Sequence, residues 1–219
     1  MQARAEETIS LATAHGFPFF AVQGSILQGW VLAEQGQVEA GITQIRQGLA
    51  AFRDLGIEAT RPYFLALLAE AYGTAQQAEE GLAIAAEALA IVDKTGECFY
   101  EAELYRLRGE LTLQQASQKS NSKSQKLEQT DPQSLNPDPQ GEAEACFLKA
   151  IAIAQQQQAK SWELRASTSL ARLWQSQGKR AEAHTLLSEV YNWFTEGFDT
   201  KDLQEAQELI ESLRDCDSE

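Results

Sequence analysis

Few residues of the kinds that perform catalysis or bind metals occur in this sequence, and their spacing does not suit that chemistry. The chain has two histidines, His15 and His184, and three cysteines, Cys98, Cys146 and Cys216. Neither histidine lies at ligand spacing from a carboxylate or a thiol, and no two cysteines have the C-x-x-C spacing of a metal or redox site. We therefore expect no metal site and no cofactor.

A catalytic set of nucleophile, general base and orienting residue cannot be assembled from the sequence either. Acidic pairs such as Glu79-Glu80 fall at an expected turn, where solvation explains them without acid–base catalysis. Cys98 and Cys146 are expected to pack as small apolar residues in helices. The sequence predicts a protein that binds and regulates and is not an enzyme.

The composition excludes two classes of partner. The formal net charge is −14, which repels the phosphate backbone of nucleic acids. No apolar run approaches the roughly 20 residues that a membrane span needs. Scattered cysteines and an acidic N-terminus without an apolar signal segment indicate a cytoplasmic protein.

The main pattern is an internal repeat of small residues inside apolar helical periodicity. Gly29, Ala69 and Gly109 lie 40 residues apart, and so do Gly41 and Gly81. Further small or apolar residues continue the register at positions 48, 88, 145, 152, 171, 183 and 190. Each copy contains two amphipathic segments, so the sequence predicts helical hairpins whose backbones approach closely at the small residues.

The third copy contains an extra polar segment, residues 117–140, that is rich in Ser, Gln, Asn and Pro. Such a composition buries too little apolar surface to offset its ordering entropy. We interpret the segment as a disordered insertion between the two helices of the third hairpin. A linker between two domains is the alternative, but the repeat register resumes after the segment.

These residues resemble the tetratricopeptide repeat (TPR) family, in a variant of about 40 residues per repeat. Tyr72 and Trp174 match the aromatic position of the family pattern, whereas Leu32 and Thr112 do not. The resemblance covers approximately residues 19–199 without the insertion. It implies a single all-α domain, residues 1–219, in which about four hairpins form a right-handed superhelical stack. Residues 200–214 are expected to form a C-terminal capping helix.

The last part of the chain is similar to the C-terminal end of large bacterial signalling proteins. The residues that carry this resemblance are Gly178–Ala183 and the block Tyr191–Thr200, YNWFTEGFDT. Such proteins join a class III adenylate or guanylate cyclase, or a winged-helix module, to an AAA/STAND-like signalling ATPase and a helical repeat tail. Because residues 9–12 read like the second helix of a hairpin, we expect the chain to be the tail of a longer protein. The sequence contains no Walker A loop and no recognisable cyclase metal site.

The resemblance also implies a concave groove that binds peptides, proteins or small ligands. In the repeat register, the groove face would carry aromatic and acidic residues in its first half and more basic residues in its second half. The predicted groove residues are Trp30, Glu34, Tyr63, Glu70, Arg106, Glu110, Arg165 and Arg172, with Gln23 and Glu103 beside them. An ordinary solvated surface is the alternative interpretation of this face.

Two hypotheses about function follow. In the first, the chain is the regulatory tail of a signalling ATPase or cyclase and binds a peptide, a protein partner or its own upstream domains. In the second, it is a small-molecule sensor with a metabolite in the lumen of the superhelix.

Overall fold

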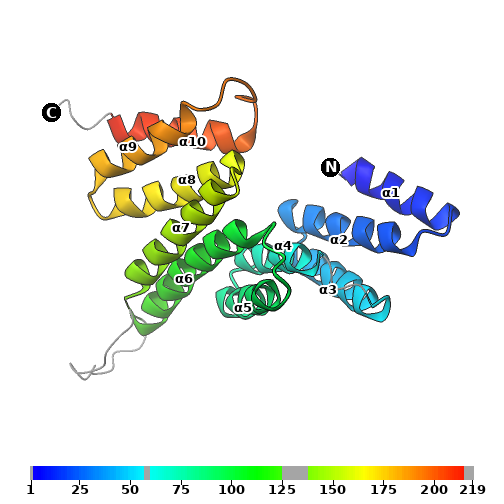
Figure 1. Ribbon diagram of the computed structural model, residues 1–219. Coiled ribbons are helices and arrows are strands. Elements are labelled where there is room, and N and C mark those ends of the chain that lie inside the picture. The colour runs from blue at the N-terminus through cyan, green and yellow to red at the C-terminus, as the bar shows by residue number, and fades with distance from the viewer. Residues whose placement is uncertain (1, 57–59, 125–137, 215–219) are drawn as a thin grey trace. The chain divides into compact units, whose positions relative to one another are not determined.

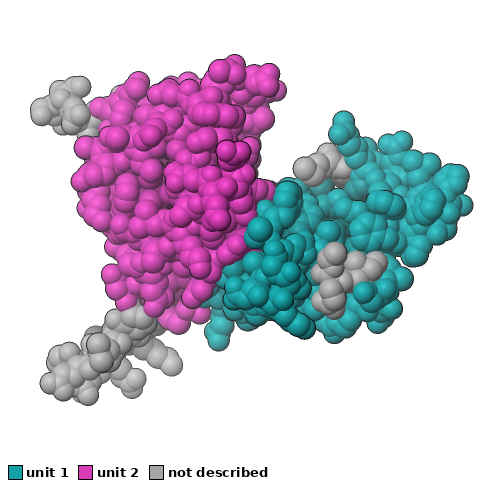
Figure 2. Space-filling view, in the orientation of Figure 1, with its two compact units in different colours: residues 1–100 teal, residues 101–219 magenta. Residues whose placement is uncertain are grey.

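The computed structural model describes residues 2–56, 60–124 and 138–214, and these residues form ten α-helices and no strand. The structure has two compact units, residues 1–100 and 101–219 (Figure 2). A stack of hairpins permits such a division because each hairpin packs mainly on its neighbours in the sequence.

Unit 1 contains five helices that follow one another as hairpins (Figure 1). Helix α2 packs against α3 and α4 against α5, while α1 lies on α2 and α3 on α4. The core between α2, α3 and α4 includes Ile26, Ile45, Phe52 and Phe64, which are all at most 5% exposed. The bounds of these helices are α1 Gln2–Ala14, α2 Pro18–Glu34, α3 Val38–Asp54, α4 Arg61–Thr74 and α5 Ala78–Thr95.

Unit 2 also consists of helices that pair with their neighbours in the sequence, and α8 is its central helix. This helix contacts α6, α7, α9 and α10, and its residues are buried on several sides. Phe147 and Leu170 lie in the core between α7 and α8, and Leu187 and Leu203 lie in the core that includes α9 and α10. The helices are α6 Glu101–Ser124, α7 Pro139–Gln156, α8 Lys160–Ser176, α9 Arg180–Tyr191 and α10 Lys201–Arg214.

The small residues of the repeat lie where paired helices meet, as the sequence predicts. A Cβ atom on Gly41 would clash with the backbone oxygen of Gly29 and would lie 2.8 Å from the backbone nitrogen of Ala33. A Cβ atom on Gly109 would lie 2.5 Å from Cε1 of Phe147, on the partner helix of its hairpin. The close approach of the helices therefore depends on glycine at these positions.

The predicted insertion, residues 117–140, is partly helical. Helix α6 continues through Ser124, and α7 already begins at Pro139. The segment has no Pro or Gly before Pro132, so nothing in the sequence interrupts α6 at residue 117. Asp138 caps α7 by accepting a hydrogen bond from the backbone nitrogen of Gln140 at 3.1 Å. The rest of the predicted insertion, residues 125–137, lies outside the described residues.

Left-handed residues end the helices where the chain turns. Gly16, Gly56 and Gly96 follow α1, α3 and α5 with φ between 69° and 73°, whereas Gly197, with φ of 78°, lies in the connection between α9 and α10. The junction between α7 and α8 lacks a glycine, and there Gln158 takes the left-handed conformation with φ of 55°.

Replacing Gln158 with glycine is expected to raise the free energy of unfolding by about 0.5–1 kcal/mol, because glycine adopts positive φ without a steric cost. The preceding Gln157 has helical geometry, with φ of −80°, so Gln157→Gly should lower stability instead. Chemical denaturation of both variants checks the prediction, and equal effects would contradict it.

Among the described residues, every helix is either too short or too polar to cross a membrane.

Candidate functional site: a charged network and the cleft beside it

The predicted groove residues fall into one set in each unit. Trp30, Glu34, Tyr63 and Glu70 belong to unit 1, and Arg106, Glu110, Arg165 and Arg172 belong to unit 2. In both sets, residues from the first helices of successive hairpins lie close together, which is the arrangement that the 40-residue register predicts.

In unit 1, the indole of Trp30 on α2 donates a hydrogen bond to Oε2 of Glu70 on α4, with a length of 2.7 Å. Trp30 is partly buried against the core, so it packs between helices. Burial, together with the nearby Glu70 carboxylate, raises the pKa of the Tyr63 hydroxyl above its ordinary value. Tyr63 also packs edge-on against Tyr100, and Glu34 is exposed near the end of α2. This set mainly connects α2 to α4.

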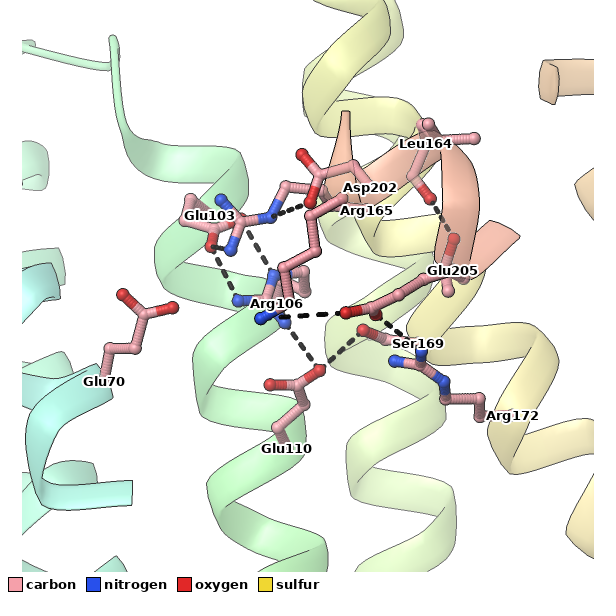
Figure 3. A network of polar contacts seen from close by, with 12 residues as sticks. Glu70, Glu103, Arg106, Glu110, Leu164, Arg165, Ser169, Arg172, Asp202 and Glu205 are labelled. Carbon is pink, nitrogen blue, oxygen red and sulfur yellow. Dashed lines mark hydrogen bonds and ion pairs between the residues drawn. The ribbon is translucent and has the colours of Figure 1, made fainter. Parts of the chain in front are cut away.

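In unit 2, a network of ion pairs begins at Glu103, which is 2% exposed (Figure 3). Arg106 donates to both oxygens of Glu103, at 2.9 and 2.7 Å, and Arg165 on α8 lies 2.9 Å from the same carboxylate. Arg106 also pairs with Glu110 at 2.5 Å. The planar guanidinium of Arg106 thus joins two carboxylates of α6, and Arg165 connects this helix to α8.

The network extends to α10 and ends at a more exposed pair. Arg165 lies 4.0 Å from Asp202, and Arg172 lies 2.7 Å from Glu205. The Arg172 side chain is 48% exposed, compared with 8% for Arg106. The buried part of the network therefore positions helices, and Arg172 is the most exposed of its three arginines.

Glu110 lies at the boundary between the network and the solvent. Burial alone would raise the pKa of this carboxyl, but Arg106, a hydrogen bond from Ser169 and the charge of Arg165 together hold the pKa below its ordinary value. The Ser169 hydroxyl donates to Oε1 of Glu110 at 2.8 Å. Glu110 is therefore ionised at neutral pH and is already bound by protein donors.

The lowered pKa of Glu110 predicts a pH dependence of stability. Because the folded pKa lies below the unfolded value, the stabilisation is complete above the unfolded pKa and is lost as the pH falls through the folded pKa. Glu110→Gln should therefore lower the free energy of unfolding at pH 7 and have a smaller effect near pH 3. Urea titrations of both proteins at the two pH values measure this difference, and an effect that grows toward pH 3 would contradict the assignment.

A cleft of about 530 Å³ opens beside the network, between α6, the start of α7 and α8. Its charged residues are Glu110 and Arg172, and its apolar residues are Leu113, Ala116, Phe147 and Leu173. The remaining lining residues are polar or near the start of α7: Ser117, Ser120, Pro139, Gln140, Ser169 and Ser176. The volume is within the usual range of small-ligand sites.

The residues singled out for metal or acid–base chemistry do not converge. No group of three His, Cys, Asp or Glu side chains in the described ranges has the geometry of a metal site. His184 accepts a hydrogen bond from Arg214, and burial raises the pKa of the half-buried Cys146 thiol. Cys98 was expected in a helix, but the structure places it exposed in the segment after α5, because that helix ends at Thr95.

Sequence reasoning missed the contribution of α10 and of the cleft floor. Asp202 and Glu205 were assigned only to a capping helix, and Phe147 was assigned no role. One signal was available: Ser169, Arg172 and Ser176 recur every three or four residues and so share one face of α8. A single sequence does not show which neighbouring helix that face of α8 contacts.

The chain has an all-α, TPR-like repeat fold, and solved structures with the same arrangement show this fold. BtubC (BKLC) from P. vanneervenii superposes with a TM-score of 0.62 at 13% identity, over 96% of this chain and 87% of that one. Two crystal structures of a Podosopora anserina protein described as a kinesin light chain, with nearly identical TPR-like repeats, give TM-scores of 0.57 and 0.56. Both are 19% identical and cover 88% of this chain, and 92% and 93% of theirs.

No protein-family model matches the sequence. An uncharacterized protein from Rhizobium meliloti (strain 1021) is 28% identical over 108 residues, which is 49% of this chain. The match spans only 10% of that relative, so the similar segment belongs to a much longer protein there.

Proposed function

We propose that this chain is a binding and regulatory module whose cleft in unit 2 holds a segment of a protein partner. The observation that carries the proposal is the lining of the cleft, where an apolar floor lies beside an accessible arginine and several hydroxyls. A site with an apolar surface and a few fixed polar groups provides both affinity and orientation for a ligand. The proposed activity is binding, and the chain itself is proposed to catalyse no reaction.

The proposal extends to the setting in which the module acts. We infer that it regulates a bacterial signalling ATPase or nucleotide cyclase, by binding a partner or other domains of the same system. Two observations support this setting: the resemblance of residues 178–203 to the tails of such proteins, and the bacterial relative that carries a similar segment within a much longer chain. Binding would favour one conformation of the larger assembly and so change its activity.

Blocking the cleft tests the proposal. Ser120 lines the cleft from the exposed end of α6, so Ser120→Trp should fill part of the space without disturbing the core. The neighbouring Lys119 is exposed and does not line the cleft, which makes Lys119→Trp the matched control. Quantitative affinity capture from bacterial extract should recover a partner with the parent chain and the control, and at least tenfold less with Ser120→Trp.

The identity of the captured protein tests the setting separately. An ATPase or cyclase domain among the proteins lost with Ser120→Trp would support the signalling role. Equal recovery by all three proteins would contradict binding in the cleft.

A metabolite sensor is the second candidate, and the cleft volume of about 530 Å³, which is within the usual range of small-ligand sites, favours it. A ligand that binds only the folded chain raises the melting temperature by mass action, with a stabilisation of about 2.7 kcal/mol at 100 times its Kd. Thermal shift against a metabolite library, with Ser120→Trp as the negative variant, distinguishes this function. A shift of equal size in both proteins would place the ligand elsewhere.

A further inference from the structure

The hydrogen-bonding capacity of the cleft indicates what kind of ligand fits it, and this inference rests on the proposed binding function. A serine hydroxyl has one proton to donate and two lone pairs that accept. All four serines of the cleft donate their proton inside the protein: Ser117 to the Leu113 oxygen at 3.0 Å, Ser120 to the Ala116 oxygen at 2.7 Å, Ser176 to the Leu173 oxygen at 2.7 Å, and Ser169 to Glu110. Toward the cleft, these hydroxyls can therefore only accept.

The charged end of the cleft, at Arg172, provides hydrogen-bond donors. Arg172 engages Glu205 through Nη2, and a guanidinium carries five N–H donors. The exposed side chain of Arg172 can therefore donate to a second carboxylate. Glu110, the other charged residue of the cleft, is less available to a ligand than Arg172. Arg106 and Ser169 already bind one of its oxygens, and Arg106 offsets its charge.

Between the two ends, Leu113, Ala116 and the edge of Leu173 form an apolar surface. The lining residues of α6 extend from Glu110 to Ser120, which corresponds to about 15 Å along a helix that rises about 1.5 Å per residue. An extended chain advances about 3.3 Å per residue, so about five residues of peptide span this length.

We propose that the cleft binds an extended peptide segment of about five residues with an acidic side chain at one end. The carboxylate pairs with Arg172, an apolar side chain lies on Leu113, Ala116 and Leu173, and backbone N–H groups donate to the serine hydroxyls. A peptide backbone supplies donors at a regular spacing, which matches a wall of acceptors better than a rigid anionic metabolite does.

A library of five-residue peptides, blocked by acetyl and amide groups at their ends, tests the ligand class on the chain of residues 1–219. Blocked ends ensure that every carboxylate belongs to a side chain. We expect selection of Asp or Glu at one end and of Leu, Ile, Phe or Met near the middle. Replacing the selected acid by its amide should weaken binding about tenfold, as expected for the loss of one charge-assisted hydrogen bond.

Variants of the chain separate the three contacts. Arg172→Gln should lose about tenfold in affinity and no longer distinguish the acid from its amide, whereas Arg108→Gln, an exposed change on α6, should do neither. N-methylation of the central peptide amides should also weaken binding, because it removes the donors. Ser176→Ala should have a smaller effect in the same direction.

The outcomes also separate this inference from the proposed function. Selection of basic peptides, or an acid preference that survives Arg172→Gln, overturns the ligand class. Absence of any selected peptide also overturns it, and the capture experiment with Ser120→Trp then shows whether the cleft still binds a partner of different chemistry.

Discussion

Replacing Glu103 with alanine is expected to lower the free energy of unfolding by about 3–5 kcal/mol, because it leaves Arg106 buried without its main partner. Arg106 is 6% exposed and makes two hydrogen bonds to Glu103, and Arg165 shares the same carboxylate. Urea denaturation followed by circular dichroism measures the loss. The partly exposed Glu101 in the first turn of the same helix gives a comparison, since Glu101→Ala should change stability by at most about 0.5 kcal/mol.

The double variant Glu103→Leu/Arg106→Leu distinguishes two contributions of this pair. A buried ion pair is costly to desolvate, so two apolar side chains should recover most of the stability that the single change loses. If the double variant is as unstable as Glu103→Ala, Arg165 and Glu110 depend on the pair more strongly than the geometry indicates.

Gly41→Leu is expected to destabilise unit 1 by about 3 kcal/mol. The first side-chain atom would already clash with the backbone of Gly29 and Ala33, and backbone atoms on the facing helix cannot turn aside as a flexible side chain can. The matched control is Gln47→Leu on the exposed side of α3, for which we expect a change within about 0.5 kcal/mol. Thermal or urea denaturation of both variants measures the difference, and similar losses would contradict the close contact of α2 and α3.

Gly29, Gly41 and Gly109 show why the hairpins were predictable from sequence. A small residue in an otherwise apolar helix face has few explanations other than a close neighbour. Because Gly29 and Gly41 recur 40 residues later as Ala69 and Gly81, the pattern indicates that these two positions meet within each hairpin. The 40-residue register therefore identified both the helix pairs and their contact points. The helix expected at residues 200–214 on other grounds corresponds to α10, Lys201–Arg214.

The charged network was less predictable. Glu103 and Arg106 were assigned to the groove face, yet both are buried. A helical pattern gives the direction of a side chain, but burial depends on which helix covers that direction. The Glu103–Arg165 pair joins residues from two different hairpins, and only the packed structure brings them together.

Polar composition also misled the prediction for residues 117–124. The absence of apolar residues indicated disorder, but in α6 Ser117 and Ser120 bond to the carbonyl oxygens of the preceding turn. Such bonds are compatible with a helix that neighbouring residues have already started. At Gln158, conversely, composition could not indicate the left-handed turn, because glutamine carries no specific preference for it.

The position of α8 among four neighbouring helices has a consequence for how this protein can change over time. Between Glu163 and Leu173 nearly every position is buried, including Ser167, Thr168 and Ser169. A helix with one solvent face can exchange half of its residues freely, whereas α8 has almost none that mutate without altering a contact. Small hydroxyl side chains suit such crowded positions, so new binding preferences are easier to acquire through α6 and α10 than through the helix they both pack on.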